Sequence, residues 1–183
     1  MDLELEKIVL PLRVNWKISR NSSSEKQNYI LTMKDGGFTV MSEIAPNIRY
    51  GETHENIEQE FKRFVEIVKS GEDYDSALND FNWKHSLRFA LESAWVKLCS
   101  LRAGVDLATF IKAPSLGPVL TSMSVPIMDP AEIPAYIKQI GVFPSYKIKV
   151  SKDTAWDMVK TVAKVAPGVP LRIDGNEAWE DLS

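Results

Sequence analysis

The alternation of expected strands and helices in the second part of the chain constrains its fold most. Beyond a proline- and glycine-rich cluster at 113–118, apolar runs with strand character alternate with segments whose apolar residues recur at helical spacing. The predicted order is strand, helix, strand, helix, strand, at residues 119–127, 129–140, 146–150, 155–162 and 170–174. Strands that alternate with helices form a parallel sheet with right-handed crossovers. Pro134 in the first turn favours a later start for the first helix.

The first part of the chain has a different pattern. Three strands are predicted, followed by two longer helices and a short one, at 3–10, 28–34, 37–44, 57–68, 87–98 and 106–111. Pro11 is expected to end the first strand, and the polar stretch 19–25 is expected to be a mobile loop. The sequence Asp35-Gly36-Gly37 predicts a hairpin between the second and third strands. The cluster at 113–118 is the predicted boundary between domains 1–115 and 116–183.

Composition and charge narrow the class of protein. The 183 residues are 44% apolar and 26% charged, which is ordinary for a soluble globular protein. A net charge of −3 provides no global basic field for nucleic acid or anionic lipid. Cys99 is the sole cysteine, so no internal disulfide can form. With no apolar run of membrane-spanning length and no signal-peptide pattern, we expect a cytoplasmic protein.

Two lysines and an acidic residue on neighbouring expected strands are the strongest chemical signal. Side chains at i and i+2 of a strand point to the same face, so Lys147 and Lys149 share one face. Asp174 and Asn176 share a face at the end of the following strand. If these faces line the inside of a barrel, two amines and a carboxylate meet in a space that normally holds Val and Leu. Ionised groups are rarely buried without a chemical reason.

Each of these residues also has an ordinary structural interpretation. A lysine pair on a strand is commonly a solvated strand edge, because lysine is usually exposed. The ordinary alternative for Asp174 is a turn or a helix N-cap, both of which aspartate favours. The context of the two motifs decides between these interpretations.

The motifs and their order resemble the enolase superfamily, in its muconate-lactonizing-like branch. The Lys-x-Lys at 147–149 precedes the Asp-x-Asn at 174–176 by one βα unit, behind a region with the form of a capping domain. The resemblance implies an α+β capping domain at 1–115, followed at 116–183 by α/β structure, the first three strands of a TIM-like (β/α) barrel. Three stretches resemble dipeptide epimerases of the Ala-Glu type: 18–20, 42–52, and 120–125 leading to 129–130.

The resemblance implies an isomerase that abstracts a proton α to a carboxylate. By correspondence with the family, Lys149 is the acid/base and Lys147 is its electrostatic partner. A neighbouring ammonium makes protonation of the base less favourable. Asp174 would be the first ligand of a divalent metal, which oxygen ligands suggest is Mg²⁺. The metal would take up the charge that develops on the substrate carboxylate.

The implied partner is a small-molecule carboxylate such as a dipeptide. Arg20 lies in the loop that closes over the substrate in the family, where a guanidinium can pair with a distal carboxylate. Ser124, near the end of the first barrel strand, could hydrogen-bond the dipeptide backbone, and Asn176 is the third candidate for substrate binding. A solvated loop arginine and a packing serine are the ordinary alternatives. A homo-oligomer is expected for the complete protein.

The family pattern also requires residues that a chain ending at Ser183 does not contain. Two further acidic metal ligands belong on the fourth and fifth barrel strands, and a second base lysine belongs on the sixth. We therefore expect the 183 residues alone to be inactive. Segment 172–179 also fits o-succinylbenzoate synthases, which use the same lysines for a dehydration. A non-catalytic α/β module that binds a partner through an exposed sheet edge is the alternative from another class.

Overall fold

The computed structural model describes residues 1–18, 21–79, 81–114 and 117–175. The chain divides into two compact units, each of which is described by itself. The first unit holds residues 1–10 and 26–115, and the second holds residues 11–25 and those from 116 onward. A long two-stranded ribbon near the N-terminus therefore contributes to both units.

An antiparallel sheet forms the base of the first unit. It has the order β1-β2-β3, from β1 (Asp2–Ile18), β2 (Asn21–Asp35) and β3 (Phe38–Ile44). Strands β2 and β3 are antiparallel, with Asp35 opposite Phe38 at the turn. Gly36 and Gly37 both have positive φ, 56° and 85°, which is what a tight two-residue turn between twisted strands requires. The predicted hairpin is confirmed.

The first strand is longer than its sequence predicted. It continues past Pro11 to Ile18, and β2 begins at Asn21, inside the segment expected to be a loop. Both expectations are wrong for the described residues. A proline removes only one donor from a ladder, and β1 lies at the edge of the sheet, where that loss is tolerated. Ser22 Oγ donates to Asn15 Oδ1 at 2.8 Å.

Three helices close the core over the first sheet: α1 (His54–Lys69), α2 (Tyr74–Asn79) and α3 (His85–Arg102). The short helices η1 (Ile48–Tyr50) and α4 (Leu107–Phe110) bury no residue. Thr53 caps α1 in a capping box with Asn56, and the buried positions of α1 are Ile57, Phe61 and Phe64, as the helical spacing predicted. Helix α2, of six residues, was not predicted. The core joins the inner faces of β2 and β3 to the buried faces of α1, α2 and α3.

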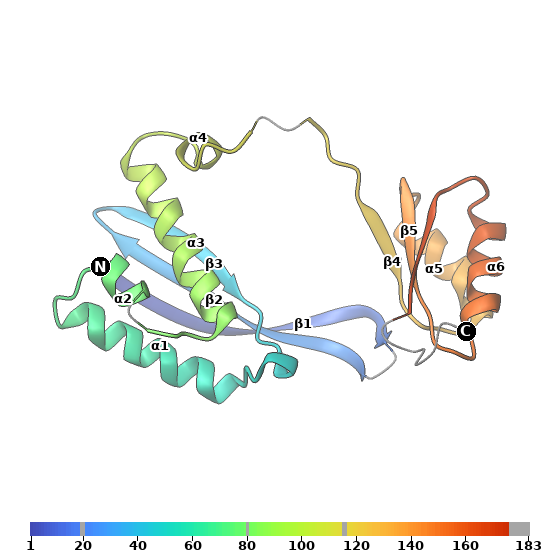
Figure 1. The fold of residues 1–183 in the computed structure, drawn as a ribbon, viewed down its shortest axis with the longest axis horizontal. Coiled ribbons are helices and arrows are strands. Elements are labelled where there is room, and N and C mark those ends of the chain that lie inside the picture. The colour runs from blue at the N-terminus through green and yellow to red at the C-terminus, as the bar shows by residue number, and fades with distance from the viewer. Residues whose placement is uncertain (19–20, 80, 115–116, 176–183) are drawn as a thin grey trace. The chain divides into compact units, whose positions relative to one another are not determined.

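A parallel sheet with helices forms the second unit. Its order is β4-β5-β6, and the elements along the chain are β4 (Ser122–Val125), η2 (Pro130–Glu132), α5 (Ile133–Ile140), β5 (Ser145–Lys149), α6 (Ala155–Val165) and β6 (Leu171–Asp174). Helices α5 and α6 lie on the same side of this sheet (Figure 1). Asp129 caps η2, and α5 begins at Ile133 with Pro134 in its first turn. The fold-class prediction, an α+β part followed by the start of an α/β barrel, is confirmed.

The outer half of the ribbon packs on the second unit. Leu12, Val14 and Trp16 are half-buried, whereas the residues between them are exposed. Val14 contacts the second core, and the backbone N–H of Ile127 donates to the carbonyl of Lys17 at 3.1 Å. The end of the ribbon is thereby tied to the chain just beyond β4.

Among the helices in the described ranges, none has the length and apolar character needed to cross a lipid bilayer.

Candidate functional site

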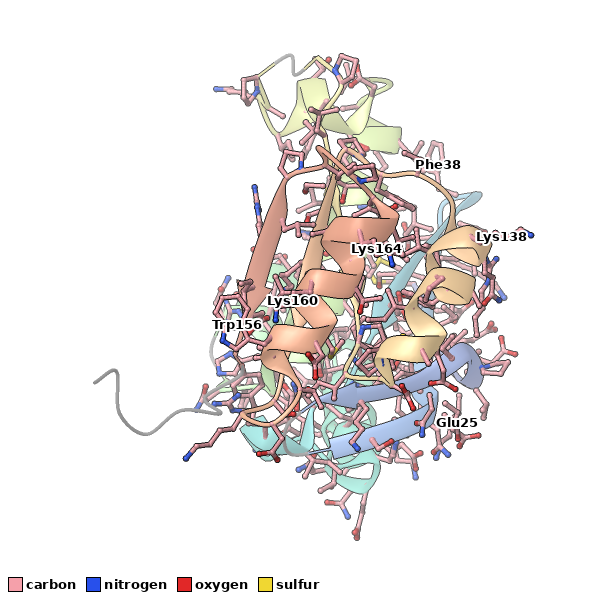
Figure 2. The ribbon with its side chains drawn as sticks, turned by 90° about the vertical axis from the view of Figure 1, so that its right-hand side faces the viewer. Glu25, Phe38, Lys138, Trp156, Lys160 and Lys164 are labelled. Atoms are coloured by element: carbon pink, nitrogen blue, oxygen red, sulfur yellow. The ribbon has the colours of Figure 1, made fainter. Side chains whose placement is uncertain are left out.

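The two faces of the parallel sheet differ sharply in polarity. On β5, Tyr146 and Ile148 are fully buried, and both belong to the core shared with α5 and α6. Lys147 and Lys149 alternate with them and therefore point to the opposite face. On the helix side, Lys160 and Lys164 project from α6, away from the strands (Figure 2). The lysines of β5, in contrast, are placed to meet residues of the neighbouring strands.

Strand register brings the predicted residues onto one face. Lys147 is level with Ser124 of β4 on one side and with Arg172 of β6 on the other, and Lys149 is level with Asp174. Residues in register on parallel strands point to the same face. We call these five residues the polar face.

Both lysines contact the same carboxylate. Lys147 Nζ lies 3.2 Å from Asp174 Oδ2, and Lys149 Nζ lies 3.5 Å from that oxygen. The side chain of Lys149 is 14% exposed, compared with 38% for Lys147 and 30% for Asp174. Ion pairs this exposed stabilise a fold by at most about 1 kcal/mol. The cluster is therefore not explained by its contribution to stability.

The cluster lies at the carboxyl end of the sheet. Lys149 is the last residue of β5, and Asp174 is the last residue of β6. The backbone N–H of Val150 donates to the carbonyl of Asp174 at 3.1 Å and holds these two strand ends together. In (β/α) barrels this end of the strands carries the reactive groups.

The other predicted site residues are placed less completely. Ser124 is half-buried on β4, and its carbonyl accepts a hydrogen bond from the Tyr136 hydroxyl at 3.0 Å. Arg20 and Asn176 lie outside the described residues. The ribbon that leads toward Arg20 is tied to the carboxyl end of β4 through Lys17.

Sequence reasoning overlooked Arg172 as a member of this face. It stands two residues before Asp174 on β6, and so shares its face by the same rule that grouped the two lysines. The signal was present in the sequence. An arginine beside a strand end is common at solvated surfaces, and only the register with Lys147 distinguishes this one.

The polar face does not by itself make a magnesium site. Asp174 supplies its one carboxylate, and the described part of the chain holds no group of three or more His, Cys, Asp or Glu side chains that could bind a metal ion. Magnesium prefers six oxygen ligands in octahedral geometry. These residues can offer one ligand, and the metal would need further ligands from elsewhere.

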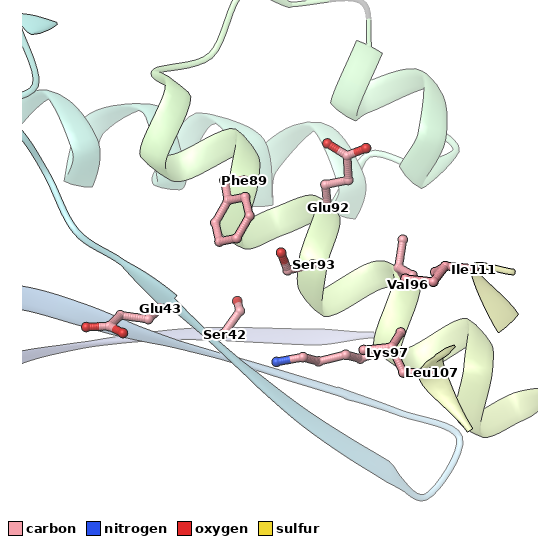
Figure 3. Close-up of a pocket in the computed structure, with 9 residues that line it drawn as sticks. All are labelled: Ser42, Glu43, Phe89, Glu92, Ser93, Val96, Lys97, Leu107 and Ile111. Carbon is pink, nitrogen blue, oxygen red and sulfur yellow. The ribbon is translucent and has the colours of Figure 1, made fainter. Parts of the chain in front are cut away.

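The first unit contains a cavity of its own. It has a volume of about 600 Å³ and lies between β3 and α3 (Figure 3). Phe89 and Val96 project into it from α3, and Leu107 and Ile111 close one end. Lys97, also on its lining, donates to the carbonyl of Met41 at 2.7 Å. None of the residues predicted for catalysis lines this cavity.

Comparison with solved structures identifies the fold. One similar structure is an enolase family member from Agrobacterium tumefaciens with homology to dipeptide epimerases, with bound sodium and L-Ala-L-Glu. It matches with a TM-score of 0.85 and 24% sequence identity, and the match covers 98% of this chain and 55% of that chain. The L-Ala-D/L-Glu epimerase from Bacillus subtilis matches with a TM-score of 0.82 and 22% sequence identity, over 98% of this chain and 54% of that chain. A dipeptide epimerase from Cytophaga hutchinsonii, complexed with Mg and the dipeptide D-Ala-L-Val, matches with a TM-score of 0.81 and 24% sequence identity. The match covers 97% of this chain and 52% of that chain.

These similarities concern the fold. No protein-family model matches the sequence, and no curated protein matches it. At identities below 25%, the shared architecture is established and the reaction is not. The chain spans about half the length of each of these structures. In its fold, the chain resembles enolase-superfamily proteins, dipeptide epimerases among them, over that half.

Proposed function

We propose that this chain contributes to a Mg²⁺-dependent isomerase that removes a proton α to a carboxylate and is most like a dipeptide epimerase. The observation that carries the proposal is the meeting of Lys147, Lys149 and Asp174 at the carboxyl end of a parallel sheet. The fold shared with the L-Ala-D/L-Glu epimerase from Bacillus subtilis over 98% of this chain supports it. In this proposal, residues 1–115 are the capping domain and residues 116–183 belong to the catalytic barrel.

Lys149 is the proposed base. Its side chain is less exposed than that of Lys147, so water competes less for its amine. The lone pair of the neutral amine takes the α-proton, and the electron pair of the broken C–H bond moves into the carboxylate to give an enediolate. The positive charge of Lys147 stabilises the enediolate oxygens. Epimerisation is completed when an acid outside the described residues returns a proton to the opposite side of the carbon.

Asp174 is the proposed protein ligand that this chain supplies to Mg²⁺. A divalent cation at this place would neutralise part of the charge on the substrate carboxylate. Its remaining ligands would come from outside the described residues, since one carboxylate does not complete a coordination sphere.

The proposed substrate is a dipeptide. Ser124 stands in register with Lys147 and is placed to contact a ligand that reaches the amines. Arg20 is proposed to bind a distal carboxylate, and the attachment of the ribbon to the end of β4 supports that role. Asn176 is proposed as a further polar contact to the substrate.

Proton exchange tests the proposal. The full-length gene product, incubated with Mg²⁺ and L-Ala-L-Glu in D₂O, is expected to replace the glutamyl α-proton with deuterium, which proton NMR detects. The Lys149→Ala variant should exchange at least about 100-fold more slowly, because it lacks the base. Lys160→Ala is the matched control, since Lys160 projects from the helix side of the sheet and packs over Trp156.

The same experiment separates the alternatives. Exchange without Mg²⁺, or unchanged exchange in Lys149→Ala, contradicts the proposal. Turnover of the cyclohexadiene substrate of o-succinylbenzoate synthases, without any dipeptide exchange, indicates the dehydratase. Absence of both activities in a folded full-length protein indicates a binding module.

A further inference from the structure

Arg172 is a charged member of the polar face to which the proposed mechanism gives no role. It lies in the middle of β6, level with Lys147 of β5, and its side chain is exposed. The side chains on either side of it, Leu171 and Ile173, point to the face that carries the helices. Arg172 therefore projects to the same side as the two lysines and Asp174.

The reach of Lys147 shows what Arg172 can contact. Lys147 starts one row below Asp174, yet its amine lies 3.2 Å from the Asp174 carboxylate. An extended arginine is longer than a lysine, so the guanidinium of Arg172 can reach the same level. It makes no ion pair with any residue in the described ranges, although Asp174 is its neighbour on the same face of β6.

The charge balance of this face favours an anionic ligand. Among the described strand residues, the polar face has three basic side chains and one acidic side chain, and the acidic one already contacts both lysines. A guanidinium stays charged at any physiological pH and binds a carboxylate through two parallel N–H donors. A ligand carboxylate is the group that would satisfy these donors.

We infer that Arg172 is an additional binding residue for the reacting carboxylate, beside Lys147. The inference rests on the proposed function for the identity of the ligand. Arg172 and Lys147 hold the α-carboxylate from adjacent strands, while Arg20 binds the distal carboxylate. Two donors on adjacent strands fix the plane of the carboxylate, which sets the direction in which the α-proton faces Lys149.

Three dipeptides that differ in one carboxylate test this division. They are L-Ala-L-Glu, with both carboxylates; L-Ala-L-Gln, with only the α-carboxylate; and L-Ala-L-isoglutamine, with only the distal one. Binding to the full-length gene product with Mg²⁺ is followed by calorimetry. Arg172→Gln should weaken binding of the first two about tenfold or more and leave the third unchanged. Arg172→Lys should recover part of the loss. Arg20→Gln should weaken the first and third and leave the second unchanged.

Equal weakening of all three ligands by Arg172→Gln, with a lowered melting temperature, makes Arg172 a structural residue and overturns the inference. Selective loss of L-Ala-L-isoglutamine overturns it as well, since the arginine then binds the distal group. If Arg172→Gln binds all three dipeptides as the unsubstituted protein does, and the enzyme is active, the inference is overturned and the proposed function stands. Failure of the unsubstituted protein to bind any of the three contradicts both.

Discussion

At the scale of single residues, Glu52 is the most constrained charged group of the first unit. The residue is 2% exposed, and its two carboxylate oxygens accept hydrogen bonds from the backbone N–H groups of Asn47 and Ser86, both at 2.9 Å. Burial alone raises the pKa of Glu52, but the bonds from Ser86 and Asn47 outweigh it and hold the pKa below its ordinary value. One carboxylate thus ties the turn after β3 to the start of α3.

Replacing Glu52 by glutamine should destabilise the first unit by about 1–3 kcal/mol at pH 7, because an amide can accept only one of the two bonds. Urea unfolding measures this loss. A carboxyl whose pKa is lowered on folding contributes stability above its unfolded value of 4.5, and that contribution is lost as the pH falls through its folded pKa. The variant should therefore lose less stability than the parent below pH 4.5. Exposed Glu55 is the control, and equal effects of Glu55→Gln would contradict this account.

His54 should make the free energy of unfolding depend on pH at higher pH values than Glu52 does. Tyr29 donates its hydroxyl proton to Glu58 at 2.7 Å, so the His54 Nδ1–H, at 3.1 Å, donates to the Tyr29 oxygen. Burial and the charge of Lys7 lower the pKa of His54, and Glu58 opposes them. The contribution of His54 to stability is therefore complete above its unfolded pKa of 6.5, and it is lost as the pH falls through the pKa of His54 in the folded protein. The His54→Gln variant should lose this dependence, and parallel stability curves from pH 7.5 to 5 would contradict the prediction.

At the scale of elements, local signals predicted most of the fold. Asp35-Gly36-Gly37 located its turn because two successive positive φ values leave few residue choices. The apolar spacing of α1 located its buried side because a helix repeats every 3.6 residues. The extension of β1 beyond Pro11 was missed because proline was taken as a stop, although the alternation of Leu12, Val14 and Trp16 continued the strand pattern.

The candidate site was predictable for a similar reason. Alternation along β5 put Lys147 and Lys149 on one face, and the order of parallel strands put Asp174 beside them. Neither rule specifies which residues face the cluster from further along the chain, because that depends on long-range packing. For the same reason the roles of Arg20 and Asn176 remain predictions.

The attachment of the ribbon to the second unit can be tested through Val14. Replacing Val14 by serine removes an apolar contact with the second core and should loosen the Lys17–Ile127 hydrogen bond. Hydrogen exchange of the Ile127 amide should then accelerate about tenfold or more. Val9 lies on the same strand but is 53% exposed, so Val9→Ser is the matched control. Equal acceleration in both variants would mean that the ribbon detaches as a whole.

At the scale of the whole molecule, the presence of two separate cores predicts that a core substitution destabilises one unit without destabilising the other. Leu91 is fully buried in the first core and Ile148 in the second, and the two clusters share no buried residue. Replacing either by alanine should cost about 2–5 kcal/mol in its own core. Because each substituted residue belongs to the core of one unit, the loss should stay largely within the unit that carries the substitution.

Native-state hydrogen exchange distinguishes this from a single cooperative domain. Leu91→Ala should speed exchange at core amides of α1 and α3 while the amides of β5 keep their protection, and Ile148→Ala should do the reverse. Loss of protection in both units from either substitution would show that the ribbon transmits unfolding from one core to the other. In that event the stability of the polar face would depend on the first unit, and core substitutions in that unit would alter the proposed ligand binding by Lys147 and Arg172 without touching the ligand.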